Sequence, residues 1–242
     1  MTSRLVLCLG DLFIPDRAND IPAKFKKLLT PGKIGQILCL GNLTSPSVYT
    51  FLRNLAPDLQ LVKGDFDISL SAPAPPNPNA PYAAPTDQIP VPTALSKVVT
   101  HGGLRIGFTH GHTIVPPGDP DSLLIAARQM DVDVLCWGGT CKFEAYEMEG
   151  KFFVNPGSAT GAVSWSSDIE LDSEGEAVST PSFVLMDVSR HASWANLIDL
   201  SDHPEQVQGD VLVLYVYQLR KDQNGVENVA VEKVSYRKNA SS

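Results

Sequence analysis

The sequence predicts an α/β domain in which buried strands alternate with helices and each strand ends in a polar loop. Short apolar runs cover 4–9, 37–40 and 59–63, and each is followed by glycine and then by aspartate or asparagine. Helices are expected between these runs, at 23–29 and about 46–55. This alternation favours a parallel sheet, whose functional loops lie at the carboxyl ends of its strands.

Proline and glycine set the limits of these first helices. Pro22 precedes the first helix and Pro31-Gly32 ends it, while Ser45-Pro46 begins the second. Proline suits the first helical turn, where its missing N–H leaves no bond unmade, and it cannot continue a helix.

The second half of the chain predicts a hairpin, one helix and a series of strands. The hairpin joins 97–100 to 104–109, and the helix covers 119–130 with Asp119 or Asp121 as its N-cap. Further strands are predicted at 132–137, 143–148, 151–154, 182–188, 211–219 and 229–236.

Length and composition are those of one domain. The chain has 242 residues, 43% of them hydrophobic and 19% charged, which is enough for one sizeable core. We therefore expect a single domain over 1–242. Three stretches rich in proline or in polar residues are expected to be flexible insertions, at 71–96, 164–180 and 189–210.

Charge and hydropathy exclude several classes of protein. The net charge of −8 repels phosphate backbones, so nucleic acid is not an expected partner. No apolar run approaches the roughly 20 residues that span a bilayer, and no signal-peptide pattern is present. The cysteines Cys8, Cys39, Cys136 and Cys141 are interpreted as buried free thiols of a cytoplasmic protein.

Polar motifs stand at the ends of the predicted strands. In chain order they are Gly10-Asp11-Leu12-Phe13, Gly41-Asn42-Leu43, Gly64-Asp65-Phe66-Asp67, His110-Gly111-His112, Gly138-Gly139-Thr140-Cys141 and Asn155-Pro156-Gly157-Ser158. This series resembles the motifs of the calcineurin-like metallophosphoesterases. The resemblance implies a four-layer α/β/β/α sandwich.

Within that superfamily the chain resembles the small-subunit family of retromer, a protein-sorting coat. The matching stretches are spread over nearly the whole chain outside the insertions. They are 9–12, 21–29, 31–34, 64–67, 110–112, 142–145, 155–162, 181–187 and 216–219.

The resemblance identifies the ligands of a two-cation centre that have changed. Such a centre holds its cations about 3.5–4 Å apart, and each cation needs several carboxylate or imidazole ligands. The histidine positions are occupied here by Phe13, Gly139 and Cys141. Because one lost ligand commonly costs ~10–100-fold in metal affinity or activity, we predict that the chain is not an enzyme.

The remaining positions form a vestigial metal site. Asp11 and His110 are unchanged, Asn42 replaces the bridging aspartate but keeps an oxygen, and Asp65 takes the usual asparagine position. No cofactor is expected to be required, while weak binding of one divalent cation, Zn or Mn, stays open. The favoured alternative is that the aspartate and asparagine side chains cap turns after glycine.

The resemblance implies a first interaction surface at the rim of this site. There the family docks on the large α-solenoid subunit of retromer, vacuolar protein sorting-associated protein 35. The matching residues are Phe13, His112, Ile114 and Val115. Apolar side chains on a loop stiffened by Pro116-Pro117 bind with little loss of entropy. The open alternative is that Ile114 and Val115 pack into the core of the domain itself.

A second surface is implied on the far side of the sandwich, where the family receives regulatory peptides, including a Rab GTPase-activating protein. Tyr215 and Tyr217 have the period-two spacing that places both on one face of a strand. For Leu5 and Leu185, a place in the core is the alternative. The matching residues are Leu5, Leu28, Leu185, Tyr215, Tyr217 and Val231.

The predicted function is that of a non-catalytic scaffold subunit of the retromer cargo-selective complex, active in endosome-to-Golgi transport. The protein is expected in the cytoplasm and, through its partners alone, on the cytosolic face of endosomes. Two alternatives stay open. One is a divergent metal-dependent phosphoesterase, and the other is a peptide-binding adaptor unrelated to retromer.

Overall fold

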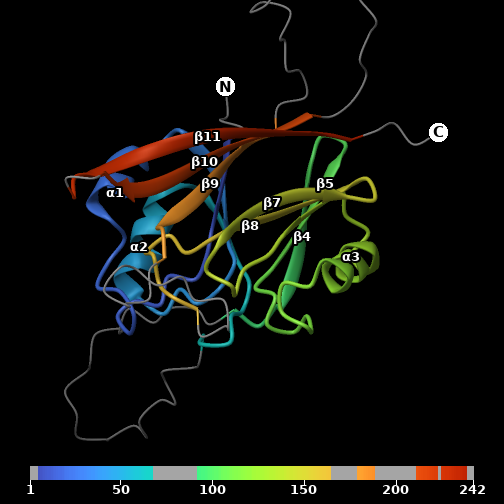
Figure 1. The fold of residues 1–242 in the computed structure, drawn as a ribbon, viewed down its shortest axis with the longest axis horizontal. Helices are drawn as coiled ribbons and strands as arrows, with labels where there is room; N and C mark the ends of the chain where they lie inside the picture. Colours follow the sequence, from blue (N-terminus) through green and yellow to red (C-terminus); the bar gives the residue numbers. More distant parts are fainter. Residues whose placement is uncertain (1–4, 68–91, 165–178, 189–210, 223–224, 239–242) are drawn as a thin grey trace, which may run out of the picture.

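Two β-sheets pack face to face and carry helices on their outer sides (Figure 1). The computed structural model describes residues 5–67, 92–164, 179–188, 211–222 and 225–238. The expected insertions at 71–96, 164–180 and 189–210 lie largely outside the described residues.

The first sheet has six strands in the order β11-β10-β9-β1-β2-β3. Strand β1 is parallel to β2, and β2 to β3, whereas β9, β10 and β11 join on the other side of β1 as antiparallel neighbours. The strands are β1 (Leu5–Leu9), β2 (Ile34–Cys39), β3 (Asp58–Leu61), β9 (Ser182–Asp187), β10 (Val211–Lys221) and β11 (Glu227–Arg237).

The second sheet has five strands in the order β4-β5-β6-β8-β7. Its three central strands, β5, β6 and β8, are parallel, and its two edge strands are antiparallel to their neighbours. The strands are β4 (Ser96–His101), β5 (Leu104–Thr109), β6 (Val134–Cys136), β7 (Phe143–Met148) and β8 (Lys151–Pro156).

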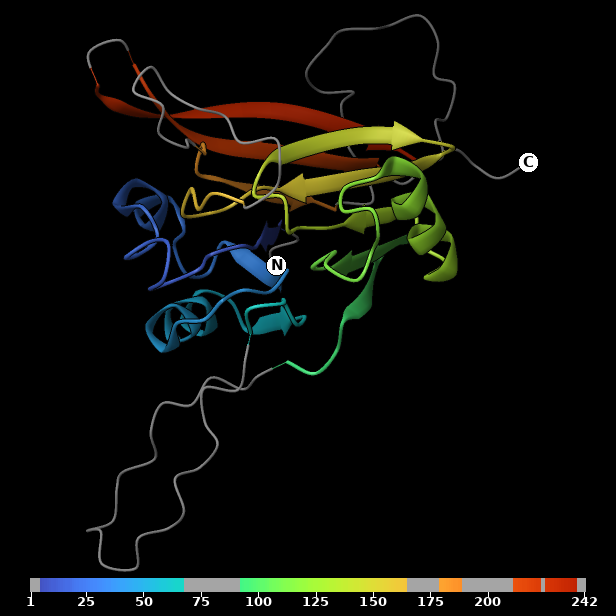
Figure 2. The same cartoon turned by 60° about the horizontal axis from the view of Figure 1, so that its bottom comes forward.

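Helices form the two outer layers. Helices α1 (Ala23–Leu28) and α2 (Pro46–Leu55) pack on the six-stranded sheet, and α3 (Pro120–Gln129) packs on the five-stranded one. Figure 2 shows α1 and α2 on the left of the molecule and α3 on the right. The side chain of Asp119 caps α3 by accepting a hydrogen bond from the N–H of Ser122 at 2.8 Å. The predicted four-layer α/β/β/α sandwich is confirmed.

The main hydrophobic core lies between the two sheets. It is built from alternate residues of strands on both sides, such as Val6 and Cys8 on β1 and Phe108 on β5, all fully or almost fully buried. All four cysteines are buried and free, as predicted. In the described part of the chain, no helix is long and apolar enough to cross a membrane.

The parallel strands of both sheets end on the same side of the sandwich. An isolated parallel bridge between Gly10 and Ser158 joins the loop after β1 to the loop after β8 at that end. The polar motifs of the sequence are therefore brought to one place, where loops from the two sheets meet.

Candidate functional site

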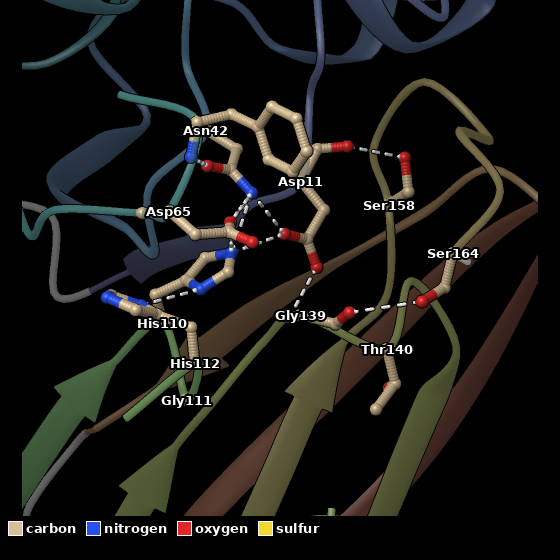
Figure 3. A network of polar contacts seen from close by, with 12 residues as sticks. Asp11, Asn42, Asp65, His110, Gly111, His112, Gly139, Thr140, Ser158 and Ser164 are labelled. Carbon is tan, nitrogen blue, oxygen red and sulfur yellow. Dashed lines mark hydrogen bonds and ion pairs between the residues drawn. The ribbon is translucent and has the colours of Figure 1, made fainter. Parts of the chain in front are cut away.

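Four side chains from four loops converge at the carboxyl ends of the parallel strands (Figure 3). Asp11 follows β1, Asn42 follows β2, Asp65 follows β3 and His110 follows β5. Asp11, Asn42 and His110 are buried, whereas the side chain of Asp65 is 45% exposed. The sequence thus correctly indicated which loops meet here.

Asn42 lies at the centre of this group. Its Oδ1 accepts a hydrogen bond from the backbone N–H of Phe66 at 2.9 Å. Its Nδ2 lies 2.9 Å from Asp65 Oδ1, 3.5 Å from Asp11 Oδ1 and 2.7 Å from His110 Nε2. We had expected an amide oxygen to face the vestigial ligands. That expectation was wrong, because the N–H of Phe66 draws the oxygen away and turns the NH₂ group inward.

Asp11 connects this group to the second sheet. Its Oδ2 accepts a hydrogen bond from the backbone N–H of Gly139 at 2.7 Å, and its Oδ1 lies 3.0 Å from His110 Nε2. Burial disfavours the charged imidazole, but the hydrogen bond to Asp11 and the carboxylates of Asp11, Asp65 and Asp67 outweigh it and raise the pKa of His110 above 6.5.

Asp67 is a structural residue to which the sequence analysis assigned no role. One of its oxygens accepts hydrogen bonds from the backbone N–H groups of Asn42 and Gly64, both at 2.8 Å, and the other accepts from Leu43 at 3.1 Å. This buried carboxylate therefore holds the loops after β2 and β3 together. The sequence signal that could have indicated this role is the place of Asp67 as the last residue of the Gly64–Asp67 motif.

The approach of these two loops requires glycine at position 64. A Cβ atom there would lie 2.1 Å from Oδ1 of Asn42 and 2.6 Å from its backbone nitrogen. Real Cβ atoms essentially never come within 3.0 Å of a heavy atom outside their own chain neighbours. Any larger residue would therefore push the loops apart.

Ser158 ties the loop after β8 to the site. Its hydroxyl donates to the carbonyl oxygen of Asp11 at 2.7 Å and accepts from the backbone N–H of Ala162 at 2.8 Å. Asn155 Oδ1 accepts from the N–H of Gly157 at 2.9 Å within the same turn. These contacts hold 155–158 as a rigid turn in which the hydroxyl of Ser158 is already hydrogen-bonded.

The backbone of the site is strained. Asp11, Phe13, Asn42 and Cys141 all lie in the left-handed region, with φ of 52°, 47°, 53° and 59°. Residues with a Cβ avoid this region, and such conformations persist where the surrounding structure enforces them. Strain therefore gathers at the positions where the superfamily motifs place metal ligands.

Two of the altered positions supply no effective ligand. Phe13 is buried, and its ring meets that of Phe66 edge-on at 5.3 Å between centroids, with the Arg17 guanidinium carbon 3.9 Å from its centroid. Burial, followed by the charge of Asp11, raises the pKa of Cys141 far above its ordinary value, so its thiol stays neutral. A neutral thiol is a poor metal ligand.

The residues present do not fit a two-cation centre. At the bridging position, Asn42 offers N–H groups, which repel a cation. At one of the expected histidine positions, Gly139 has no side chain that could bind a cation. Among the described residues, no group of three or more His, Cys, Asp or Glu is arranged to hold a metal ion. Asp11 and His110 are hydrogen-bonded to each other, and Asp65 to Asn42, instead.

A cleft of about 640 Å³ opens beside this cluster. Its lining mixes aromatic, basic and acidic side chains and includes Phe13, Arg17, Asp65, Phe66, Lys142 and Glu144. Phe66 is 41% exposed at its edge. Phe13 and Phe66 thus give the mouth of this cleft an apolar, aromatic wall.

The loop after β5 presents its two aliphatic residues differently. Ile114 packs against the cluster under α3 that includes Leu123 and Trp137. Val115 is 75% exposed. His112, between this loop and the site, has its Nδ1 3.1 Å from His110 Nδ1. Ile114 is therefore partly buried against the core, while Val115 is exposed to solvent.

Five of the six residues of the second expected surface share one face of the six-stranded sheet, and Leu28 lies on α1. Leu185 pairs with Leu7 on one side and with Tyr215 on the other, and Tyr217 pairs with Val231. Tyr217 stacks on Phe183 at 4.8 Å between centroids. Leu5, Leu185, Tyr215 and Tyr217 are half-buried, while Leu28 and Val231 are exposed.

Comparison with known proteins agrees with the fold and the motifs. The calcineurin-like phosphoesterase superfamily domain matches residues 5–190. The chain therefore belongs to the calcineurin-like phosphoesterases.

Within that superfamily the chain is similar to vacuolar protein sorting-associated protein 29 of Schizosaccharomyces pombe. The two are 46% identical over 234 residues, which cover 97% of this chain and 98% of that protein. The chain thus belongs to the vacuolar protein sorting-associated protein 29 (Vps29) family, the small subunits of retromer.

Two solved structures are informative about ligands. Vps29 of Chaetomium thermophilum, complexed with a RaPID-derived cyclic peptide, RT-D3, has a TM-score of 0.71 and 47% identity, covering 99% of this chain and 100% of that one. Wild-type Vps29 of Entamoeba histolytica, complexed with Zn²⁺, has a TM-score of 0.67 and 34% identity, covering 96% and 98%.

Proposed function

We propose that this protein is a non-catalytic scaffold in retromer that docks on the end of the large α-solenoid subunit, vacuolar protein sorting-associated protein 35, and recruits regulatory partners for endosome-to-Golgi transport. It needs no cofactor for this role. The whole chain, 1–242, acts as one domain with insertions. It works in the cytoplasm and reaches the cytosolic face of endosomes through its partners.

The observation that carries this proposal is the contrast between Val115 and the polar residues beside it. Val115 is 75% exposed on a proline-stiffened loop, at the rim of a cluster whose carboxylates and imidazole are engaged with each other. A large apolar side chain held outward supports docking of a partner. Phe66 and His112 extend the same rim, whereas Phe13, expected there from the sequence, is buried against Phe66.

Chemistry at the old metal site is disfavoured by its ligands. A two-metal phosphoesterase needs lone pairs aimed at both cations. Here position 42 aims N–H groups at the centre, and Phe13, Gly139 and Cys141 replace imidazoles. This donor set supports a scaffold rather than a hydrolase.

Regulatory peptides, such as one from a Rab GTPase-activating protein, are proposed to bind the face formed by β9, β10 and β11. The half-buried Leu185, Tyr215 and Tyr217 line one face there, with Val231 exposed beside them. Aromatic anchors next to aliphatic residues suit peptide side chains. The cyclic-peptide complex of the Chaetomium relative supports peptide binding by this family.

Substitution of Val115 by aspartate tests the docking proposal. The charge would be buried unpaired in the interface, so affinity for the large solenoid subunit should fall more than a hundredfold, about 3 kcal/mol. Ile125→Asp is a control for added surface charge, because Ile125 is 55% exposed on α3, outside the loop that carries Val115. Calorimetric titration and thermal unfolding of both variants give affinity and stability.

Unchanged affinity of Val115→Asp would show that the docking loop is wrongly assigned. Equal loss in Ile125→Asp would show a non-specific effect of charge. Failure of the native protein to co-purify with an α-solenoid subunit would instead favour a stand-alone peptide adaptor.

A second candidate function is a divergent metal-dependent phosphoesterase. The zinc complex of the Entamoeba relative favours it, as does the meeting of Asp11, Asp65 and His110 in one place. Hydrolysis of a generic phosphomonoester or phosphodiester with Mn²⁺ or Zn²⁺ tests this candidate. Turnover that disappears in Asp65→Ala would establish it and defeat the scaffold-only proposal.

A further inference from the structure

The NH₂ group of Asn42 occupies a position that is unusual for this superfamily. It faces an oxygen of Asp11, an oxygen of Asp65 and Nε2 of His110, at 3.5, 2.9 and 2.7 Å. These atoms come from three other loops and from both sheets. A single polar group thus contacts the side chains that metal ions would otherwise hold together.

The orientation of the amide follows from its neighbours. With the oxygen toward Phe66, the amide accepts the N–H of Phe66 and donates to Asp65 and Asp11. The reverse orientation would set the amide nitrogen against the N–H of Phe66 and the amide oxygen against two carboxylates. Three of the four contacts therefore require the orientation observed, while Nε2 of His110, which donates to Asp11, lies beside the NH₂ group without accepting from it.

We propose that the carboxamide of Asn42 takes the place of the bridging cations in this chain: its two N–H donors tie Asp65 to Asp11, and His110 closes the cluster by its hydrogen bond to Asp11, which keeps the loop rim ordered without metal. The inference concerns the internal chemistry of the site. It stands apart from the identity of any partner that the rim binds.

The strained backbone is an independent reason to expect such a tie. Asp11, Phe13 and Asn42 are held in the left-handed region, which costs free energy and must be offset by the contacts around them. Asp67 fixes the backbone after β2 and β3, and Ser158 fixes the backbone at Asp11. In addition to these backbone contacts, the amide of Asn42 connects the side chains of the same loops.

The cluster also reaches the rim. Nε2 of His110 contacts Asn42, and Nδ1 of the same ring lies 3.1 Å from Nδ1 of His112, the first residue of the rim loop after Gly111. The N–H of Ile114 donates to the carbonyl of Gly111 at 2.9 Å. An ordered Asn42 thus positions the loop that carries Val115.

The first experiment uses the native protein. In ¹⁵N-edited NMR spectra, the two side-chain amide protons of Asn42 should exchange slowly and show an Overhauser contact to the His110 ring. Addition of MnCl₂ to a chelator-treated sample should leave these signals no more relaxed than those of a distant asparagine such as Asn228. An amide proton in contact with Phe66, or fast exchange, would overturn the orientation and the proposal.

The second experiment turns the site back toward metal chemistry. In Asn42→Asp, the N–H of Phe66 still has an acceptor, but a carboxylate oxygen then faces Asp11 and Asp65, so like charges meet. In EDTA its melting temperature should lie below that of the native protein. MnCl₂ should raise it by roughly 5 °C, because an ion that binds only the folded state stabilises it.

Asn42→Leu is the matched control, since it keeps the volume and removes the donors. Its melting temperature should be low in EDTA and in MnCl₂ alike. The native protein should melt at the same temperature in both. The proposal would be overturned if MnCl₂ raised the melting temperature of the native protein as much as that of Asn42→Asp and had no such effect on Asp65→Ala. That result would show that the original residues hold a cation. These outcomes are independent of solenoid binding.

Discussion

The loop rim and the β9–β11 face use their side chains in opposite ways. At the rim, the polar residues Asp11, Asn42 and His110 are buried and contact one another, and the solvent-facing residues are Val115 and Phe66. On the β9–β11 face, the outward residues include the half-buried Leu185, Tyr215 and Tyr217, which are carried by regular strands. One surface is built on strained loops and the other on a sheet.

The two surfaces therefore differ in the interactions that keep their side chains in place for a partner. The rim depends on a buried polar network, so its geometry is lost when one loop moves. The β9–β11 face depends on strand pairing that extends over whole strands, such as the continuous register between β10 and β11. We therefore expect the rim to be sensitive to small backbone changes and the sheet face to respond mainly to changes in chemistry.

Gly64→Ala should break the rim with the largest effect. The new Cβ would clash with Asn42, so we expect a destabilisation of about 2–3 kcal/mol, measured by denaturant unfolding. Gly150→Ala is the control for backbone strain alone, because Gly150 has a positive φ, of 72°, which Gly64 does not share, and has nothing within 4 Å of the added atom. It should cost only about 1 kcal/mol. Equal costs at both sites would mean that the loops do not meet as described.

Leu185→Glu should separate the two surfaces. A charge among half-buried apolar side chains should weaken a regulatory peptide at least tenfold, about 1.4 kcal/mol, and leave solenoid affinity unchanged. Fluorescence polarisation with a labelled peptide and titration with the solenoid subunit measure the two affinities. Parallel loss of both would indicate general unfolding instead of a local surface, which circular dichroism would verify.

His101→Gln should give the smallest change in stability of the three variants. It tests a third region, apart from the rim and the β9–β11 face, where β4 meets the other sheet. Nε2 of His101 lies 2.9 Å from Gln36 Oε1, and Gln36 is hydrogen-bonded to Asp58. Burial lowers the pKa of His101 below 6.5, and the charge of Asp58 opposes this only in part.

The unfolded chain therefore binds this proton at higher pH than the folded protein does, and the native protein loses stability as the pH falls through 6.5. His101→Gln should remove that loss, which we expect to stay below about 1 kcal/mol. Unfolding curves at pH 7.5 and pH 5.5 measure it. A variant with the same acid sensitivity as the native protein would assign the effect to other groups.

Much of the fold could be predicted because its signals are local. Apolar runs ending at Gly-Asp or Gly-Asn gave β1 and β3, and Asp119 marked the start of α3. The start of β2 at Ile34 was predicted too late, at 37, since Gly35 and Gln36 interrupt the apolar run. The hairpin of β10 and β11 extends further than predicted, because its ends are polar and held by pairing alone.

The site was less predictable because its decisive contacts are not local. The motifs indicated which residues converge, but the orientation of Asn42 depends on the backbone N–H of Phe66, which another loop supplies. The role of Asp67 depends on N–H groups from two loops. Sequence alone also could not distinguish Ile114 from its exposed neighbour Val115, because that difference depends on the packing beneath α3.

The most direct test of the account is the affinity of the native protein for the large solenoid subunit, titrated once in EDTA and once in MnCl₂. We predict equal dissociation constants, because the rim is ordered by its own side chains. Binding that is tenfold or more weaker in EDTA, and restored by MnCl₂, would contradict the account.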